Sequence, residues 1–121
     1  MTWYFQGSLV FAVDPTGAHT NPRPVVVISD ADRPYLEEEA TVVCLGTKAD
    51  ERYKHSTPVL PNDVINNAHL KKTTYVLPWA IYTISLSSID DTLPRGRLTD
   101  EGMDLISDAV DNMIRPCPPS T

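Results

Sequence analysis

The chain has 121 residues, of which 41% are hydrophobic, and a formal net charge of −6. This length fits one domain over residues 1–121, and the apolar content supports a core and excludes an intrinsically disordered chain. No apolar run approaches the roughly 18 residues of a membrane-spanning helix, and residues 1–7 lack the pattern of a signal peptide, so we expect a soluble, cytoplasmic protein.

The acidic charge is unevenly distributed along the chain. From Ser87 onward seven acidic residues stand against three basic ones, and residues 37–39 form another acidic run. The middle of the chain holds the bases Lys48, Arg52, Lys54, Lys71 and Lys72. Nucleic-acid-binding proteins are more often basic, so the net charge counts against RNA or DNA as a partner. The clustered bases nevertheless allow a locally basic face.

Three strands are predicted in the first half of the chain, at residues 8–13, 24–28 and 40–45. Each is a short run rich in β-branched or other apolar residues. Between the first two, residues 14–17 read Asp-Pro-Thr-Gly, a turn in which proline fixes φ and glycine permits positive φ. Pro24 fits the first position of the second strand, where no ladder donor is needed.

Three further short strands are predicted at residues 57–60, 73–77 and 81–84. Pro58 and Pro61 interrupt the first of these. Proline at residue 78 separates the other two, because proline cannot donate to a strand ladder.

One helix is predicted at about residues 100–114. Thr99 is a suitable N-cap, and acidic residues follow it at the positive end of the helix dipole. Pro116 prevents continuation, and residues 115–121 are expected to form a flexible tail. The predicted apolar stripe comprises Met103, Ile106, Val110 and Met113. Several short strands with one C-terminal helix predict a mainly β fold, a small and strongly bent antiparallel barrel.

The loop before the second strand carries the residues with the clearest chemistry. His19 and Arg23 lie between a turn and the β-branched strand that follows. An imidazole changes protonation near neutral pH, and a guanidinium binds phosphate bidentately. An acid/base group beside a permanent cation suits a site that handles a phosphodiester. The alternatives are a solvated loop histidine and an arginine that ties the loop down through an ion pair.

The chain contains two cysteines, Cys44 in a predicted strand and Cys117 in the proline-rich tail. They do not form a metal-ligand spacing, and one pair does not staple a domain of this size. We therefore expect two free thiols, with Cys44 packing as a small hydrophobic residue. No metal or other cofactor is predicted.

Three segments share their order and spacing with a known family. Residues 14–19 resemble a loop in which a histidine follows an Asp-Pro-Thr turn, and Arg23-Pro24 with its strand resembles an Arg-Pro element. Residues 42–47 resemble a strand that ends in a hydroxyl residue lining an active site. Together they resemble the MazF/PemK family of toxins of type II toxin–antitoxin systems, in particular its PemK/Kid branch. The similarity covers roughly residues 7–114 in element order.

The resemblance implies the small SH3-like barrel of CcdB/MazF/PemK toxins, a homodimer and a cognate antitoxin. It implies a metal-independent endoribonuclease that cuts single-stranded RNA, such as mRNA, without a cofactor. The implied catalytic residues are Arg23, which would grip the phosphate, Thr47, which would donate to a phosphate oxygen, and His19, which would move a proton. An ordinary strand-end threonine remains the alternative for Thr47.

The chain departs from the family pattern at two places. The loop between His19 and Arg23 is shorter than in many members, and residues 77–80 differ from the Kid-like branch. In that branch an arginine and an aspartate after the fifth strand take part in acid/base chemistry. Residues 77–80 read Leu-Pro-Trp-Ala here and contain no ionisable group. The Arg-Pro arginine and the strand-end threonine would be left to carry the mechanism.

Further residues are candidates for RNA contact. Lys48, Arg52, Lys54 and His55 could follow the RNA backbone, although acidic neighbours make a charged surface loop the alternative. Trp79 could stack on a base, with packing in the core or a dimer interface as the alternative.

Two other functions compete with RNA cleavage. One is a non-catalytic toxin resembling CcdB, which shares the fold and poisons a topoisomerase by contact. The other is a catalytically idle barrel that serves as a dimeric binding module. The Arg-Pro loop and the strand-end threonine favour the nuclease, whereas the acidic balance and residues 77–80 favour a protein-binding role.

Overall fold

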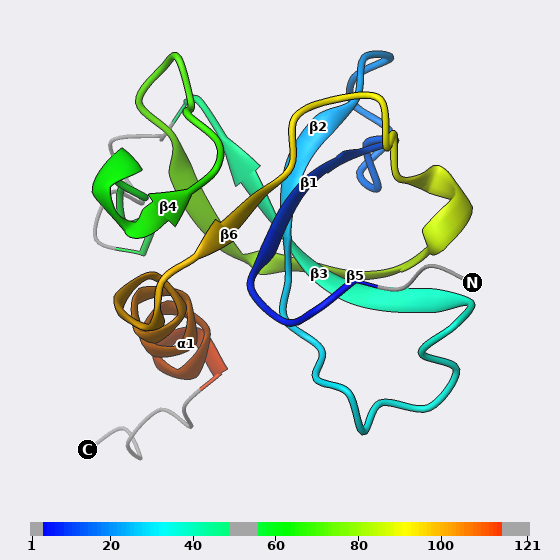
Figure 1. Cartoon of the computed structure of the whole chain (residues 1–121). Coiled ribbons are helices and arrows are strands. Elements are labelled where there is room, and N and C mark those ends of the chain that lie inside the picture. The colour runs from blue at the N-terminus through cyan, green and yellow to red at the C-terminus, as the bar shows by residue number, and fades with distance from the viewer. Residues whose placement is uncertain (1–3, 49–55, 115–121) are drawn as a thin grey trace.

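A computed structural model describes residues 4–48 and 56–114. Six strands form one antiparallel sheet in the order β4-β6-β1-β2-β3-β5. The elements are β1 (Ser8–Ala12), β2 (Arg23–Val27), β3 (Glu39–Gly46), β4 (Ile65–Asn66), β5 (Tyr75–Ser85), β6 (Gly96–Leu98) and α1 (Asp100–Ile114). Figure 1 shows the sheet curling strongly, with α1 alongside β6. The predicted mainly β fold with a C-terminal helix is confirmed.

The sheet is buried on both faces, which explains the unbroken apolar run of β2. Val25, Val26 and Val27 are all fully buried. Val25 and Val27 belong to a core cluster on one face of the sheet, while Val26 belongs to a second cluster that includes Ile106 of α1. Because successive strand residues point to opposite faces, a strand covered on both sides needs apolar residues at every position.

The prediction of two separate strands in the region of β5 is wrong. The strands predicted at 73–77 and 81–84 form a single strand that passes through Pro78. Opposite β5, Val43 pairs with Ile81 but the next residue pairs with Leu77, so residues 78–80 form a bulge. β5 lies at one edge of the sheet, where a proline and a bulge are tolerated.

The prediction of a strand at residues 57–60 is wrong. That segment makes only an isolated bridge, between Val59 and Tyr75. β4 and β6 were not predicted. They have only two and three residues and pair with each other. Strands this short depend on their partners rather than on a periodic pattern of their own.

The helix follows the prediction closely. Thr99 caps it, because its Oγ1 accepts a hydrogen bond from the backbone N–H of Gly102 at 3.2 Å. Met103, Ile106 and Val110 pack on the sheet as predicted, whereas Met113 is 40% exposed. The apolar stripe thus covers the core only over the first three turns. The predicted tail, residues 115–121, and Cys117 lie outside the described residues.

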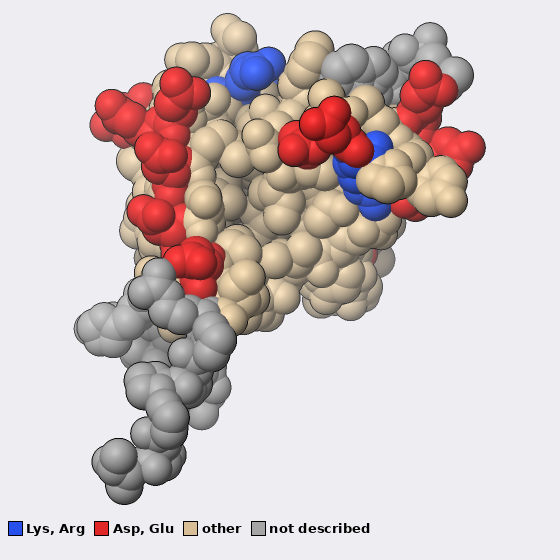
Figure 2. Space-filling view, turned by 90° about the horizontal axis from the view of Figure 1, so that it is seen from below, with Lys and Arg blue, Asp and Glu red and all other residues tan. Residues whose placement is uncertain are grey.

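Acidic side chains gather on the outer side of α1. Figure 2 shows them in a row along the helix, and the exposed residues of that row are Asp100, Glu101, Asp104, Asp108 and Asp111. This row accounts for much of the net negative charge. No helix within the described part of the chain is both long and apolar enough to cross a membrane.

Candidate active site

The Asp14 carboxylate organises the loop between β1 and β2. One of its oxygens accepts hydrogen bonds from the backbone N–H and the hydroxyl of Thr16, at 2.9 and 2.7 Å. The other accepts the backbone N–H of His19 at 3.0 Å and lies 2.9 Å from Nδ1 of that imidazole. Gly17 completes the turn with a φ of 75°, which glycine adopts without strain. A single side chain therefore holds both the turn and the histidine.

Asp14 is ionised across the physiological pH range. Its burial is the largest single influence and raises the pKa of the carboxyl. The hydrogen bonds from Thr16 and His19 together outweigh that effect and lower the pKa of Asp14 to about 2. An ionised carboxylate has no proton to donate and can only accept hydrogen bonds.

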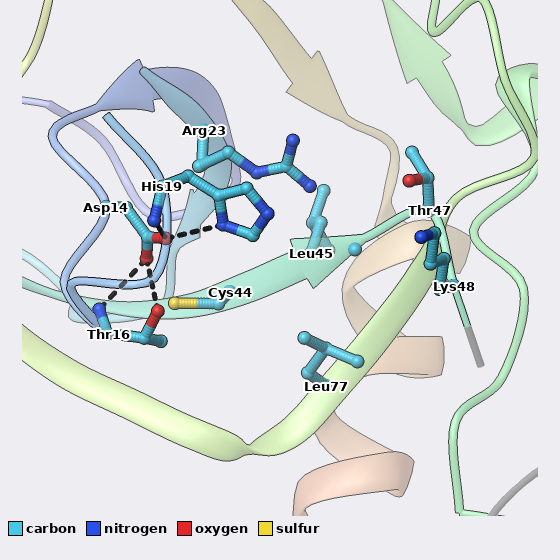
Figure 3. Close-up of a pocket in the computed structure, with 10 residues that line it drawn as sticks. Asp14, Thr16, His19, Arg23, Cys44, Leu45, Thr47, Lys48 and Leu77 are labelled. Carbon is cyan, nitrogen blue, oxygen red and sulfur yellow. Dashed lines mark hydrogen bonds and ion pairs between the residues drawn. The ribbon is translucent and has the colours of Figure 1, made fainter. Parts of the chain in front are cut away.

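The ionised carboxylate fixes the orientation of His19. Because Asp14 only accepts, Nδ1 of His19 carries the proton in that contact. Nε2 is then the nitrogen that can accept a proton when the imidazole is neutral. The His19 side chain is 55% exposed, and Figure 3 shows its ring extending from Asp14 toward Arg23. Asp14 thus positions a solvent-accessible imidazole.

Arg23 is the first residue of β2 and pairs with Ala12 at the end of β1. This register places its side chain where the two strands meet the loop that carries His19. Figure 3 shows the guanidinium reaching past the imidazole into the space in front of the end of β3. Within residues 4–48 and 56–114, the guanidinium forms no ion pair.

These residues line one pocket of about 240 Å³. Thr47 and Lys48, which directly follow β3, form the opposite wall (Figure 3). The complete lining comprises Asp14, Thr16, His19, Arg23, Cys44, Leu45, Gly46, Thr47, Lys48 and Leu77. The pocket brings together an oriented imidazole, a guanidinium, a hydroxyl and an ammonium group around a partly apolar floor.

Cys44 belongs to that floor. It is a free, buried cysteine, as predicted. Burial, and secondarily the negative charge of Asp14, raise the pKa of the Cys44 thiol to about 11. The thiol is therefore protonated at neutral pH and is a poor nucleophile.

The structure places the sequence-predicted residues unequally. His19, Arg23, Thr47 and Lys48 meet at this pocket. Trp79 lies on the bulge of β5, is 51% exposed and does not line the pocket, so it is not a core residue. The predicted RNA contacts Arg52, Lys54 and His55 lie outside the described residues.

Asp14 was not predicted as a member of the site. It was expected only as part of a turn, although an aspartate at the start of such a turn commonly accepts hydrogen bonds from following residues. That local preference was the available signal. Leu77 was also missed, because its place in the pocket depends on the register of β5 around its bulge.

No group of three His, Cys, Asp or Glu side chains within residues 4–48 and 56–114 is placed to hold a metal ion. The charged side chains that line the pocket are Arg23, Lys48 and Asp14, which holds the His19 imidazole.

The family model and the solved structures that resemble this chain point to one group. Residues 6–114 match the family model described as PemK-like, MazF-like toxin of type II toxin–antitoxin system. No curated protein matches at a significant level.

Solved structures are similar over nearly the whole chain. An endoribonuclease from a mycobacterial species, in complex with its cognate antitoxin, shares 18% identity with a TM-score of 0.68, covering 98% of this chain and 100% of that one. A MazE–MazF structure from Deinococcus radiodurans shares 15% identity with a TM-score of 0.67, covering 97% of this chain and 100% of that one. The Mycobacterium tuberculosis toxin MazF-mt6 shares 19% identity with a TM-score of 0.62, covering 86% of this chain and 92% of that one. At these identities the likeness shows the shared fold.

Proposed function

The chain belongs to the PemK-like, MazF-like family of toxins of type II toxin–antitoxin systems, and from that premise we propose that it is an endoribonuclease that cuts single-stranded RNA. The observation that carries the proposal is the pocket in which Asp14 orients His19 beside Arg23. RNA contains its own nucleophile, the 2′-hydroxyl, so a protein needs only to move protons and stabilise charge. The pocket provides groups for both tasks.

His19 is the proposed proton carrier. Nε2 of the neutral imidazole takes the proton of the 2′-hydroxyl as the 2′ oxygen attacks the adjacent phosphorus. The bond from phosphorus to the 5′ oxygen breaks, and that oxygen receives a proton from the imidazolium or from water in the pocket. The products are a 2′,3′-cyclic phosphate and a 5′-hydroxyl. Asp14 stabilises the imidazolium that forms in between, since its carboxylate lies 2.9 Å from Nδ1.

Arg23 is the proposed phosphate-binding residue. A guanidinium can donate two parallel hydrogen bonds to the phosphoryl oxygens, and its charge opposes the negative charge that develops on the phosphorane. Thr47 and Lys48 on the opposite wall donate to the same phosphate or to its neighbour. The reaction in this scheme uses no metal and no cofactor.

The test is digestion of a single-stranded RNA in excess chelator by protein shown to be free of antitoxin. We expect cleavage products that carry a 2′,3′-cyclic phosphate, and cleavage about 10²–10³-fold slower by the Arg23→Ala variant prepared in the same way. Failure of the wild-type protein to cut any RNA would overturn the nuclease and favour a toxin that acts by protein contact. Cleavage that stops on chelation would reject the metal-independent scheme.

We also propose a cognate antitoxin and a homodimer. The mycobacterial and Deinococcus structures are described as complexes with an antitoxin. A pocket lined by Arg23 and Lys48 attracts carboxylates as well as phosphates, so an acidic antitoxin segment that covers Arg23 would block RNA. Exposed aromatic residues on β5, Trp79 and Tyr82, give an apolar surface for a second copy. Co-purification with the product of a neighbouring reading frame, and sedimentation as a dimer, test the two proposals.

A further inference from the structure

A second pocket shares a wall with the first. It has a volume of about 410 Å³, and Arg23 and Thr47 line both pockets. Its remaining lining comes from β1, the start of β2, the segment before β5 and the segment before β6, and includes Phe11, Pro24, His69, Lys71, Lys72, Leu93 and Pro94. A ligand bound to Arg23 in the first pocket can therefore continue into the second.

From this arrangement we propose that the second pocket binds the nucleotide next to the cleaved phosphate, with its base on the apolar floor and its far phosphate on Lys71 and Lys72. The proposal rests on the proposed ribonuclease function. It adds a binding subsite and assigns a role to the lysine pair.

The floor of the pocket has the chemistry of a base-binding surface. Phe11 presents an aromatic ring, and Leu93, Pro24 and Pro94 add flat or compact apolar side chains. Every nucleobase has a π-face that stacks on such a surface, so binding there needs no particular sequence. The exposed imidazole of His69 adds a second ring at the rim.

The cationic rim stands on a fixed segment. The side-chain amide of Asn62 donates to the carbonyl of Leu70 at 2.9 Å and accepts its N–H at 2.8 Å. The backbone of Thr74 accepts a hydrogen bond from the N–H of Leu60 at 2.8 Å, and the Thr74 hydroxyl donates to the carbonyl of Lys72 at 2.9 Å. These bonds hold the backbone on both sides of Lys71 and Lys72, so less ordering is required when a ligand binds.

The mixed lining favours a nucleotide over an acidic peptide. Arg23, the lysine pair and apolar side chains line one pocket. A nucleotide in an RNA strand brings the matching groups, because phosphates flank a flat base. A pocket of about 410 Å³ also suits one base better than an extended peptide segment, which needs several contacts along a groove.

The test measures binding separately from cleavage. A fluorescent hexanucleotide with 2′-O-methyl groups cannot be cut, because its nucleophile is blocked. Its affinity is measured by anisotropy over a series of salt concentrations for the wild type and for the Lys71→Ala/Lys72→Ala variant. Each phosphate contact with a single strand contributes about 0.7 to the slope of log affinity against log salt. Because the pair is proposed to hold one phosphate, we expect the double variant to reduce that slope by about 0.7 and the affinity about tenfold at low salt.

The matched control is Arg95→Ala/Arg97→Ala. It changes the net charge from −6 to −8, as the lysine variant does (−6 − 2 = −8). Arg95 stacks over Tyr4 at 4.8 Å and Arg97 over Phe5 at 5.4 Å, and neither lines the two pockets. We expect the control to retain the wild-type slope. Equal losses in the two variants would overturn the subsite, because the effect would then be one of net charge.

Two further outcomes separate this inference from the nuclease proposal. If the wild type cuts no RNA but binds the blocked hexanucleotide with the expected dependence on Lys71 and Lys72, the subsite stands and the nuclease falls. If the wild type cuts RNA while the lysine variant binds like the control, only the subsite falls. If the lysine variant loses binding to an acidic peptide but binds the blocked hexanucleotide like the wild type, the nucleotide subsite is overturned in favour of a peptide site.

Discussion

The two walls of the first pocket differ in how their polar groups are held. On the loop wall, Asp14 accepts four hydrogen bonds from Thr16 and His19, so these side chains are fixed before any ligand arrives. On the facing wall and at the end of β2, the side chains of Arg23, Thr47 and Lys48 have no hydrogen bond or ion pair with any partner in residues 4–48 or 56–114. We call the loop residues Asp14, Thr16 and His19 the orienting wall. We call Arg23, Thr47 and Lys48, whose polar groups are available to a ligand, the ligand-binding wall.

This division has an electrostatic consequence. The negative charge of Asp14 is satisfied locally, so it lowers the affinity of the pocket for anions less than a free carboxylate would. The acidic row of α1 lies elsewhere, on the face shown in Figure 2. An acidic protein can thus present a pocket in which cations meet the ligand, and the net charge of −6 is a poor guide to the local one.

Removing Arg23 is the strongest way to break the ligand-binding wall. Loss of one preorganised donor to a developing oxyanion typically costs about 10²–10³ in rate, and we expect this loss in kcat for Arg23→Ala. Arg23→Lys should recover little, because an ammonium group cannot reproduce the bidentate contact. Single-turnover cleavage of a short RNA measures both variants. Arg97→Ala, which removes an exposed arginine lining neither pocket, is the control.

Removing His19 tests the orienting wall. We expect His19→Ala to lower kcat about 10²-fold, the lower end of the range for general acid–base catalysis, because water in an exposed pocket can partly replace the imidazole. The pH dependence is more informative than the magnitude. The wild-type rate should depend on pH, because only the neutral imidazole accepts a proton, and the variant should lose that dependence. An unaltered pH–rate profile would reduce His19 to a loop residue.

Asp14 acts through His19, so its removal should cost no more than the removal of His19. Asparagine replaces one carboxylate oxygen by an N–H₂ group, which cannot accept the hydrogen bonds that this oxygen accepted. Loss of hydrogen bonds to a charged acceptor costs about 1.5–3 kcal/mol, which corresponds to about 10–100-fold in rate. We expect Asp14→Asn to add little to the defect of His19→Ala in the double variant. Additive losses would show that the two residues act independently.

Acid unfolding sharpens the same point without an activity assay. The folded state lowers the pKa of Asp14 from its ordinary value of 3.8 to about 2. A lowered folded-state pKa contributes stability that is fully present above the ordinary value and is lost as the pH falls toward 2. The difference in unfolding free energy between the wild type and Asp14→Asn should therefore narrow below pH 3.8. A difference that stays constant down to pH 2 would contradict the hydrogen-bonded carboxylate.

The parts of the fold that could be predicted are those with a pattern of their own. Consecutive residues form a recognisable pattern in the buried valines of β2, in the turn at residues 14–17 and in the capped helix after Thr99. The continuity of β5 through Pro78 could not be predicted, because it depends on the edge position of the strand and on a bulge set by pairing with β3. β4 and β6 owe their short ladders to each other and to β1.

The site divides in a similar way. His19 and Arg23 could be predicted from their residue types and their place in one loop, and Thr47 from a family resemblance. That Thr47 faces them across one pocket follows from the pairing of β2 with β3. The role of Asp14 depends on the path of the loop, which brings an aspartate and a histidine five residues apart to 2.9 Å. The second pocket joins segments from five parts of the chain, and no local pattern indicated it.

Thr47 is the smallest test and the one that probes the ligand-binding wall most gently. A neutral hydroxyl contributes a weaker hydrogen bond to a phosphate oxygen than a charged donor does, about 1 kcal/mol, so Thr47→Ala should cost about fivefold in kcat/KM. Thr47→Ser keeps the hydroxyl and should retain most of the rate, which separates the hydrogen bond from the packing of the methyl group. Because Thr47 lines both pockets, the alanine variant should also weaken binding of the blocked hexanucleotide. A loss in Thr47→Ser equal to that in Thr47→Ala would assign the residue to packing at the end of β3 and leave Arg23 and Lys48 as the donors of that wall.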